Sequence, residues 1–164
     1  MACSSITQHA VLFVCLGNIC RSPIAEGLFT HLIAQAGRTD EFMIDSAGTS
    51  GWHIGEPPDS DGQMAMRERG IDISRQRCRQ LRARDFETFD LLIAMDDQNR
   101  RDLVAQAATA AAAQKVRLLM DYAPGAGAAN VPDPWSCGPD AFAHVVTLIE
   151  AGCIGLLDSL PQTA

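Results

Sequence analysis

A chain of 164 residues, 47% hydrophobic and 20% charged, is long enough to bury one core and has the composition of a globular domain. Its net charge of -7 disfavours nonspecific binding to nucleic acid or to an anionic membrane. No apolar run approaches the length expected of a membrane span, and the first ten residues lack a signal-peptide pattern, so we expect a cytoplasmic protein.

The predicted elements alternate between strands and helices. The apolar run 11–14 predicts a buried strand. Ser22 and Pro23 predict the start of a helix, with Ser22 as its cap, that ends near Gly37. The later elements, in chain order, are a strand over 43–46, a helix over 60–69, a strand over 91–95, a helix to about residue 113, a strand over 116–120 and a helix with an apolar stripe over 142–153.

Strands that alternate with helices predict an α/β fold with a parallel sheet covered on both faces. We expect a single domain over residues 1–164, with residues 1–9 as a flexible N-terminal extension. Ligands of such sheets bind beyond the carboxyl ends of the strands. Segments 15–22 and 46–52 and the loop after the fourth strand are expected there.

The segment from Cys15 to Ser22 joins the first strand to the first helix and has the sequence Cys-Leu-Gly-Asn-Ile-Cys-Arg-Ser. A strand-to-helix turn directs backbone N–H groups and the positive helix end at one point, where an anion can bind. Gly17 lets the backbone curl, and the planar guanidinium of Arg21 can hold two phosphate oxygens. Since Cys15 would lie beneath the anion, the pattern predicts a phosphate-binding loop with a cysteine nucleophile.

The same donors are expected to stabilise Cys15 as a thiolate, its nucleophilic form. Ser22 can donate its hydroxyl to the Cys15 sulfur, and Asn18 is expected to hold the loop's shape through its amide, against Ser46. Each residue alone would be interpreted as packing, capping or surface charge. Their occurrence together between a strand and a helix favours the functional interpretation.

A phenolate leaving group needs a proton donor opposite the nucleophile. The segment 131–135, Val-Pro-Asp-Pro-Trp, is the best candidate, because the flanking prolines stiffen the backbone around Asp133. The alternative is a plain Pro-Asp-Pro turn, which we would favour if Cys15 were absent.

Six cysteines lie at positions 3, 15, 20, 78, 137 and 153. The chain is larger than most disulfide-stabilised scaffolds and lacks an export signal, so we expect reduced thiols. Cys15 and Cys20 have no second Cys or His pair nearby to complete a zinc site, and we expect no metal and no other cofactor.

Residues 11–26, Val-Leu-Phe-Val-Cys-Leu-Gly-Asn-Ile-Cys-Arg-Ser-Pro-Ile-Ala-Glu, resemble the signature of the low-molecular-weight protein tyrosine phosphatases. Segment 45–51, Met95-Asp96 and Asp133-Pro134 also match this family in the same order. The resemblance extends from about residue 11 to the final helix. It implies a Rossmann/flavodoxin-like three-layer sandwich with a four-stranded parallel sheet, a phosphocysteine intermediate and no metal.

The resemblance also implies residue roles. Cys15 would be the nucleophile, Arg21 the group that binds the transition state, and Asp133 the general acid. The residues expected to bind substrate are Leu16, Gly17, Asn18, Ile19, Cys20, Ser22, Trp52 and Trp135, and those expected in the supporting hydrogen-bond network are Asn18, Ser22 and Ser46.

Three further residues carry open alternatives. Cys20 matches a family cysteine that can form a protective disulfide with the nucleophile, but it could equally be packed beneath the loop. Trp52 and Trp135 would be the flat walls of a phosphotyrosine slot, with partial burial in the core as the alternative.

The implied partner is a phosphotyrosine-containing protein, with a tyrosine kinase as a candidate, and the enzyme would be a monomer or weak dimer.

The sequence also departs from the family pattern. Ser136 and Cys137 follow the Asp-Pro-Trp triplet, where an aromatic residue or glycine is common, and segment 74–80 lacks a histidine. Its three arginines, at positions 75, 77 and 79, are expected to form a solvated basic face. Asp96 is expected only to cap a helix, and His53 to border the pocket.

Two rival functions are also compatible with parts of the sequence. Thioredoxin-coupled arsenate reductases have a similar first loop but need further redox cysteines downstream, where Cys78 stands alone. A noncatalytic phosphotyrosine-binding module would lack a nucleophile and an acid, whereas this chain has Cys15 and Asp133.

Overall fold

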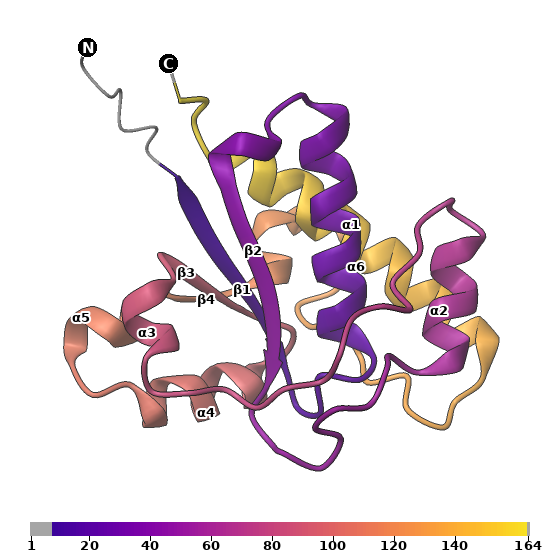
Figure 1. Cartoon of the computed structure of the whole chain (residues 1–164), viewed down its shortest axis with the longest axis horizontal. Coiled ribbons are helices and arrows are strands. Elements are labelled where there is room, and N and C mark those ends of the chain that lie inside the picture. The colour runs from indigo at the N-terminus through magenta and orange to yellow at the C-terminus, as the bar shows by residue number, and fades with distance from the viewer. Residues whose placement is uncertain (1–7, 164) are drawn as a thin grey trace.

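The computed structural model describes residues 8–163 and has one parallel sheet with strand order β2-β1-β3-β4 (Figure 1). The strands are β1 (His9–Cys15), β2 (Phe42–Gly48), β3 (Leu91–Ala94) and β4 (Val116–Leu118). The α-helices in this range are α1 (Arg21–Gln35), α2 (Ser60–Arg67), α3 (Asp85–Thr88), α4 (Asp97–Gln106), α5 (Ala110–Ala113) and α6 (Pro139–Ser159). Short 3-10 helices are η1 (Thr39–Glu41), η2 (Leu119–Tyr122) and η3 (Pro124–Ala126).

The side chains of β1 alternate between two separate cores. Val11 and Phe13 pack in a cluster with residues of α1 and α6, whereas Leu12 and Val14 pack in a second cluster with Leu103 of α4. Figure 1 shows α1 and α6 on one side of the sheet and α3, α4 and α5 on the other. The predicted three-layer α/β fold with a four-stranded parallel sheet is therefore confirmed.

Helix α6 corrects the expectation that no segment could span a bilayer. By length and composition alone, Pro139–Ser159 is apolar enough to do so. However, Phe142, Val145 and Ile149 of this helix lie in the core cluster that also contains residues of α1. A core helix passes the same test, and packing explains the apolar composition here.

Some boundaries differ from the predictions. The prediction that Ser22 caps the first helix is wrong: α1 begins at Arg21, and the side chain of its N-cap residue, Cys20, makes no capping hydrogen bond. The helix predicted to reach residue 113 is broken, because Ala107 has an extended backbone and Thr109 caps the separate α5. Helix α3 was not predicted.

The flexible N-terminal extension predicted over residues 1–9 does not include His9. His9 already belongs to β1, where it pairs with Phe42 of β2. Residues 1–7 lie outside the described part of the chain.

Candidate active site

The loop after β1 turns its carbonyl groups outward. Three of them accept a backbone N–H from another segment at 2.9 Å: Cys15 from Thr49, Leu16 from Ser50, and Ile19 from Asp59. These bonds hold the loop in a ring and leave its amide N–H groups for an anion at the centre, next to the N-terminus of α1.

Asn18 holds this loop from within. Its φ of 55° lies in the left-handed region, which asparagine tolerates better than most residues. The side-chain amide donates to Ser22 Oγ (2.8 Å) and Ser46 Oγ (3.0 Å), and its Oδ1 accepts the N–H of Arg79 at 2.9 Å. The Asn18 carbonyl accepts the thiol of Cys78 at 2.7 Å. Asn18 therefore makes four contacts that fix the loop's shape.

The Cys15 sulfur lies at the base of the loop and is buried. Ser22 Oγ is 3.1 Å from it. Because this hydroxyl accepts a hydrogen from Asn18, its own proton is free to point at the sulfur, and the other acceptor in reach, the Ala47 carbonyl, is more distant at 3.5 Å. The structure thus brings Cys15, Ser22, Asn18 and Ser46 together.

A close backbone approach behind the loop requires glycine at position 48. A Cβ on Gly48 would lie 2.9 Å from both the Gly17 carbon and the Leu16 oxygen, and these are backbone atoms that cannot yield easily. At Gly17, a Cβ would meet only the side chains of His53 and Ile19, at 3.1 Å and 3.4 Å. The tighter glycine was not identified from the sequence.

The Arg21 side chain is almost fully buried, and its guanidinium is held on one side. Nη1 donates to Asp96 Oδ2 at 2.5 Å and to the Val131 carbonyl at 3.0 Å. Nη2 lies 3.7 Å from Asp133 Oδ2. Burial lowers the pKa of Arg21, but the charges of Cys15, Asp96 and Asp133 more than offset it, so the pKa lies above its ordinary value. The guanidinium therefore remains a cation.

Asp96 was expected only to cap α4. It does so, accepting the N–H of Asn99 at 2.7 Å through Oδ1. Its other oxygen binds Arg21, a contact that bridges 75 positions of sequence. No residue near Arg21 or Asp96 in the sequence indicates this pairing.

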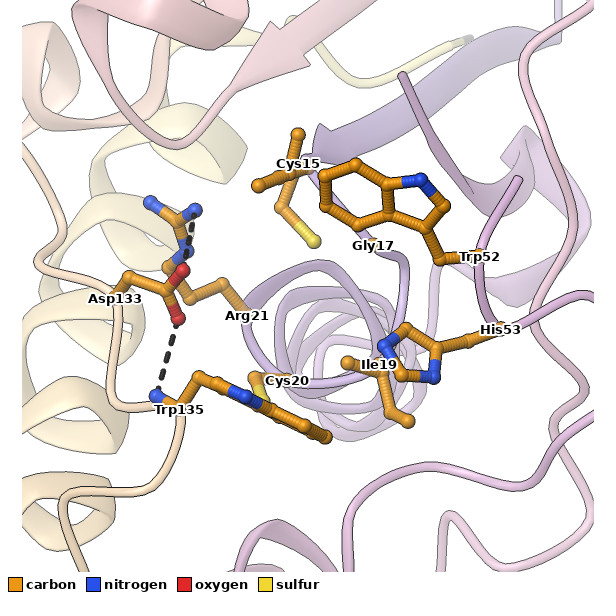
Figure 2. Close-up of a pocket in the computed structure, with 10 residues that line it drawn as sticks. Cys15, Gly17, Ile19, Cys20, Arg21, Trp52, His53, Asp133 and Trp135 are labelled. Carbon is orange, nitrogen blue, oxygen red and sulfur yellow. Dashed lines mark hydrogen bonds and ion pairs between the residues drawn. The ribbon is translucent and has the colours of Figure 1, made fainter. Parts of the chain in front are cut away.

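Asp133 enters the pocket beside Arg21 (Figure 2). Its side chain is 46% exposed, and its Oδ1 accepts the N–H of Trp135 at 3.1 Å. The carboxyl group is thus held at the mouth of the pocket, whereas the Cys15 sulfur lies at its base.

Aromatic side chains border the mouth. Trp52 is 74% exposed and Trp135 is 46% exposed, so neither belongs to the core. The His53 ring lies 5.2 Å from that of Trp135, and its Nδ1 is 2.7 Å from Glu56 Oε2. All three rings line the pocket that contains Cys15 (Figure 2).

The five cysteines in the described range are all free thiols. Cys20 is buried and lines the same pocket as Cys15. Burial, followed by Asp59 and Cys15, raises the pKa of Cys20 above its ordinary range. Burial also raises the pKa of Cys78 to about 11, with Cys15 and Glu56 adding to the shift. Both thiols are therefore neutral at physiological pH.

The expectation of a solvated arginine face is wrong for Arg79. Its side chain is only 19% exposed and lies 2.9 Å from Asp45 and 3.0 Å from Asp85. Arg75 and Arg77 are exposed, as expected. Segment 74–80 lacks a histidine, but it supports the loop through the backbone N–H of Arg79 and the thiol of Cys78.

An α/β sheet with a Cys-x5-Arg loop at the carboxyl end of its first strand is typical of cysteine-dependent phosphatases. Within residues 8–163, no group of His, Cys, Asp and Glu is arranged to hold a metal ion. The family described as low molecular weight phosphotyrosine protein phosphatase matches residues 10–164. The chain belongs to this family, and it is a protein tyrosine phosphatase.

Individual relatives agree with this assignment. The low molecular weight protein-tyrosine-phosphatase YfkJ of Bacillus subtilis is 42% identical over 93% of this chain and 96% of its own length. Its crystal structure has a TM-score of 0.87, covering 93% of this chain and 94% of that one. A protein tyrosine phosphatase from Entamoeba histolytica has a TM-score of 0.88 at 33% identity, covering 92% and 96%.

One similar solved structure has a different stated activity. DARP, an arginine phosphatase of Drosophila, has a TM-score of 0.84 at 32% identity and covers 90% of this chain and 95% of that chain. The rival interpretations as an arsenate reductase or a noncatalytic binding module are not favoured by the comparisons.

Proposed function

We propose that the enzyme hydrolyses phosphotyrosine in two steps through a phosphocysteine on Cys15. The observation that carries this proposal is the pocket itself, which has the Cys15 sulfur at its base, Arg21 at its side and Asp133 at its mouth. A phosphate bound by the loop amides would have its ester oxygen directed away from the sulfur and toward Asp133.

In the first step, the Cys15 thiolate attacks phosphorus. The S–P bond forms, the bond from phosphorus to the tyrosine oxygen breaks, and Asp133 gives its proton to the departing oxygen. In the second step, Asp133 takes a proton from water as the water oxygen attacks phosphorus. The S–P bond then breaks, inorganic phosphate leaves, and the thiolate is restored.

Arg21 would bind the transferring phosphoryl group. Its Nη1 is committed to Asp96 and Val131, which leaves Nη2 and Nε for phosphate oxygens. Anchoring one side of the guanidinium orients the other in advance, and such pre-organised donors stabilise charge that develops in a transition state.

Ser22 would assist both steps. A hydroxyl that donates to sulfur stabilises the thiolate before attack and makes it a better leaving group from phosphocysteine. Asn18 and Ser46 would act through Ser22 and not on the sulfur directly. Asn18 donates to Ser22, and Ser46 contacts Asn18.

The rim would select an aromatic ester. Trp52 and Trp135 can lie against the phenyl ring of phosphotyrosine, and the ring is long enough to carry the phosphate down to Cys15. His53, beside Trp135, would contact the residues that flank the phosphotyrosine.

We also propose that Cys20 protects Cys15. Oxidation of a reactive thiolate to sulfenic acid can be followed by attack of a nearby thiol, which releases water and forms a disulfide. Cys20 lines the pocket with Cys15 and is held as a neutral thiol, so it would not compete for phosphate.

Further features are proposed from the family and the free thiols together. We place the enzyme in the cytoplasm, acting as a single phosphatase domain and as a monomer or weak dimer. Its substrates would be phosphotyrosine proteins, with an autophosphorylating tyrosine kinase as a candidate partner. Metal and other cofactors have no part in the two steps.

A substrate survey tests the proposed function. Phosphotyrosine, phosphoserine and phosphoarginine peptides would be compared as substrates of the wild type and Cys15→Ser, with arsenate reduction assayed beside them. We expect the wild type to hydrolyse the phosphotyrosine peptide fastest, and Cys15→Ser to hydrolyse none of the peptides. Faster turnover of phosphoarginine, reduction of arsenate, or activity retained by Cys15→Ser would contradict the proposal.

A further inference from the structure

A chain of hydrogen bonds leads from the Cys15 sulfur to a carboxyl group on the far side of the loop. Ser46 Oγ donates to Glu26 Oε2 at 2.7 Å. Ser46 accepts from Asn18, Asn18 donates to Ser22, and Ser22 lies 3.1 Å from the sulfur. Glu26 is on α1, five residues after Arg21, and does not line the pocket.

The direction of the bonds that join Glu26, Ser46, Asn18 and Ser22 is determined. A serine hydroxyl has one proton, so Ser46, which gives its proton to Glu26, must accept from Asn18. The two amide hydrogens of Asn18 are then used by Ser46 and Ser22. The Asn18 amide cannot rotate end for end, because its oxygen accepts the N–H of Arg79.

We propose that Glu26 is a positioning residue for the nucleophile: its carboxylate takes the Ser46 proton, so that Ser46 accepts from Asn18 and helps hold Asn18 where it donates to Ser22, whose own proton is then presented to the Cys15 sulfur. The inference rests on the proposed role of Cys15. It adds a carboxylate that never touches substrate but acts through three other side chains.

The charge of Glu26 matters because a carboxylate can only accept. A protonated Glu26 is a weaker acceptor, and it can donate its own proton to Ser46. Ser46 would then direct its hydrogen toward the Asn18 amide, and both groups would present hydrogens to each other. Since Arg79 keeps the Asn18 amide from turning, protonation of Glu26 would weaken the Asn18–Ser46 bond and loosen Asn18 beside Ser22.

The surroundings of Glu26 bring its ionisation close to neutral pH. Burial raises the pKa of Glu26 to about 7; the bond from Ser46 opposes the shift, Asp45 adds to it and Arg79 opposes it. Arg79 is a weak partner for Glu26, because it is already bound to Asp45 and Asp85.

Glu26 can still exchange protons with solvent. It lines an open groove between α1 and segment 70–76. The other titratable groups that line this groove are His31 of α1 and Asp72. A change of pH outside the protein can therefore reach the chain that ends on Cys15.

The test compares the wild type with Glu26→Gln over a range of pH. The kcat for p-nitrophenyl phosphate is measured for both enzymes from pH 5 to pH 8.5, and the ratio of the two is plotted. Ionisation of the substrate affects both enzymes alike and cancels in this ratio. Glu68→Gln, a variant at an exposed residue after α2, makes the same change of charge and serves as the control.

We expect the ratio of wild type to Glu26→Gln to be near one at low pH. It should rise by about three- to ten-fold, the value of one lost hydrogen bond, as pH increases through about 7. The ratio to Glu68→Gln should stay near one throughout. A ratio that does not vary with pH would overturn the inference, because a merely structural role lowers activity equally at all pH values.

Ser46→Ala keeps the test valid if Glu26→Gln does not fold. Removing Ser46 breaks the chain, so the ratio of wild type to Ser46→Ala should rise over the same pH range. Glu26→Gln should then have no further effect in the Ser46→Ala background, where an additive effect would contradict the chain. If the wild type forms phosphocysteine but the ratio of wild type to Glu26→Gln stays constant with pH, only the role of Glu26 is disproved. If no phosphocysteine forms, the role of Cys15 is disproved.

Discussion

The Asp96 carboxylate lies 2.5 Å from Nη1 of Arg21, and it holds the buried guanidinium with its other nitrogens toward the pocket. Arg21 follows β1 and Asp96 follows β3, and these two strands are neighbours in the sheet. Because parallel strands end at the same edge, α1 and α4 begin side by side, and the first residue of one helix meets the cap of the other.

Asp96→Asn should weaken phosphate binding while leaving the fold intact. Asparagine caps a helix as well as aspartate does, so α4 keeps its N-terminal contact with Asn99. The charge-assisted bond to Arg21 is lost, and such bonds contribute about 1.5–3 kcal/mol. We expect a roughly 10- to 100-fold higher inhibition constant for inorganic phosphate, with a similar loss in kcat/KM.

Asp96→Ala is the companion variant, because it removes the cap as well. It should lose thermal stability in addition to phosphate affinity. If the inhibition constant of Asp96→Asn for phosphate equalled that of the wild type, Asp96 would have no part in orienting Arg21.

Asp133→Asn should slow substrates according to their leaving group. An amide at this position cannot protonate the departing oxygen, and general acid catalysis typically contributes about 10²–10⁴-fold. We therefore expect a large loss of kcat/KM for phenyl phosphate and a small loss for esters of acidic phenols. Asp140→Asn, at the start of α6, is the matched control. An equal loss for every leaving group would rule out the acid role.

Peroxide should convert Cys15 to a disulfide with Cys20. The expected product of the wild type is a Cys15–Cys20 disulfide, found by peptide mass spectrometry and reversed by dithiothreitol with recovery of activity. Cys20→Ser should instead lose activity irreversibly, whereas Cys137→Ser, at an exposed thiol, should behave as the wild type. Irreversible sulfonic acid on Cys15 as the main wild-type product would contradict protection by Cys20.

Glu26 should make the protein less stable as pH rises. Its folded pKa of about 7 lies above the ordinary value of 4.5, so the folded state keeps a proton that the unfolded state has lost. The contribution of Glu26 to the free energy of unfolding is fully present below pH 4.5 and is lost as pH rises past 7. The loss is at most about 3 kcal/mol.

Urea denaturation at pH 5 and pH 8 measures this difference. The free energy of unfolding should fall between the two pH values in the wild type and fall less in Glu26→Gln. Equal falls would show that Glu26 has an ordinary pKa. If both this and the activity ratio hold, the same ionised carboxylate destabilises the fold and orients the nucleophile.

Much of this architecture could be predicted from the sequence because its signals are local. Alternating apolar strands and helices specify the sheet, and the loop from Cys15 to Ser22 carries its own chemistry within eight residues. Asp133 could be found because the prolines beside it restrict the backbone. In each case, the residues that define the feature are neighbours in the chain.

The supporting contacts could not be predicted, since they join distant segments. Arg21 and Asp96 are 75 positions apart, and Cys78 reaches Asn18 across 60 positions. Arg79 resembles a surface cation in the sequence, but folding places Asp45 and Asp85 beside it. Nothing next to these residues in the sequence indicates their partners.

The most direct test of the account is to trap the phosphorylated enzyme during turnover. Wild-type protein would be mixed with p-nitrophenyl phosphate, quenched rapidly, and analysed by intact and peptide mass spectrometry. We predict one phosphoryl group per chain, attached to the sulfur of Cys15 and lacking in Cys15→Ser. Turnover with no phosphoryl group on the protein, or with the group on another residue, would contradict it.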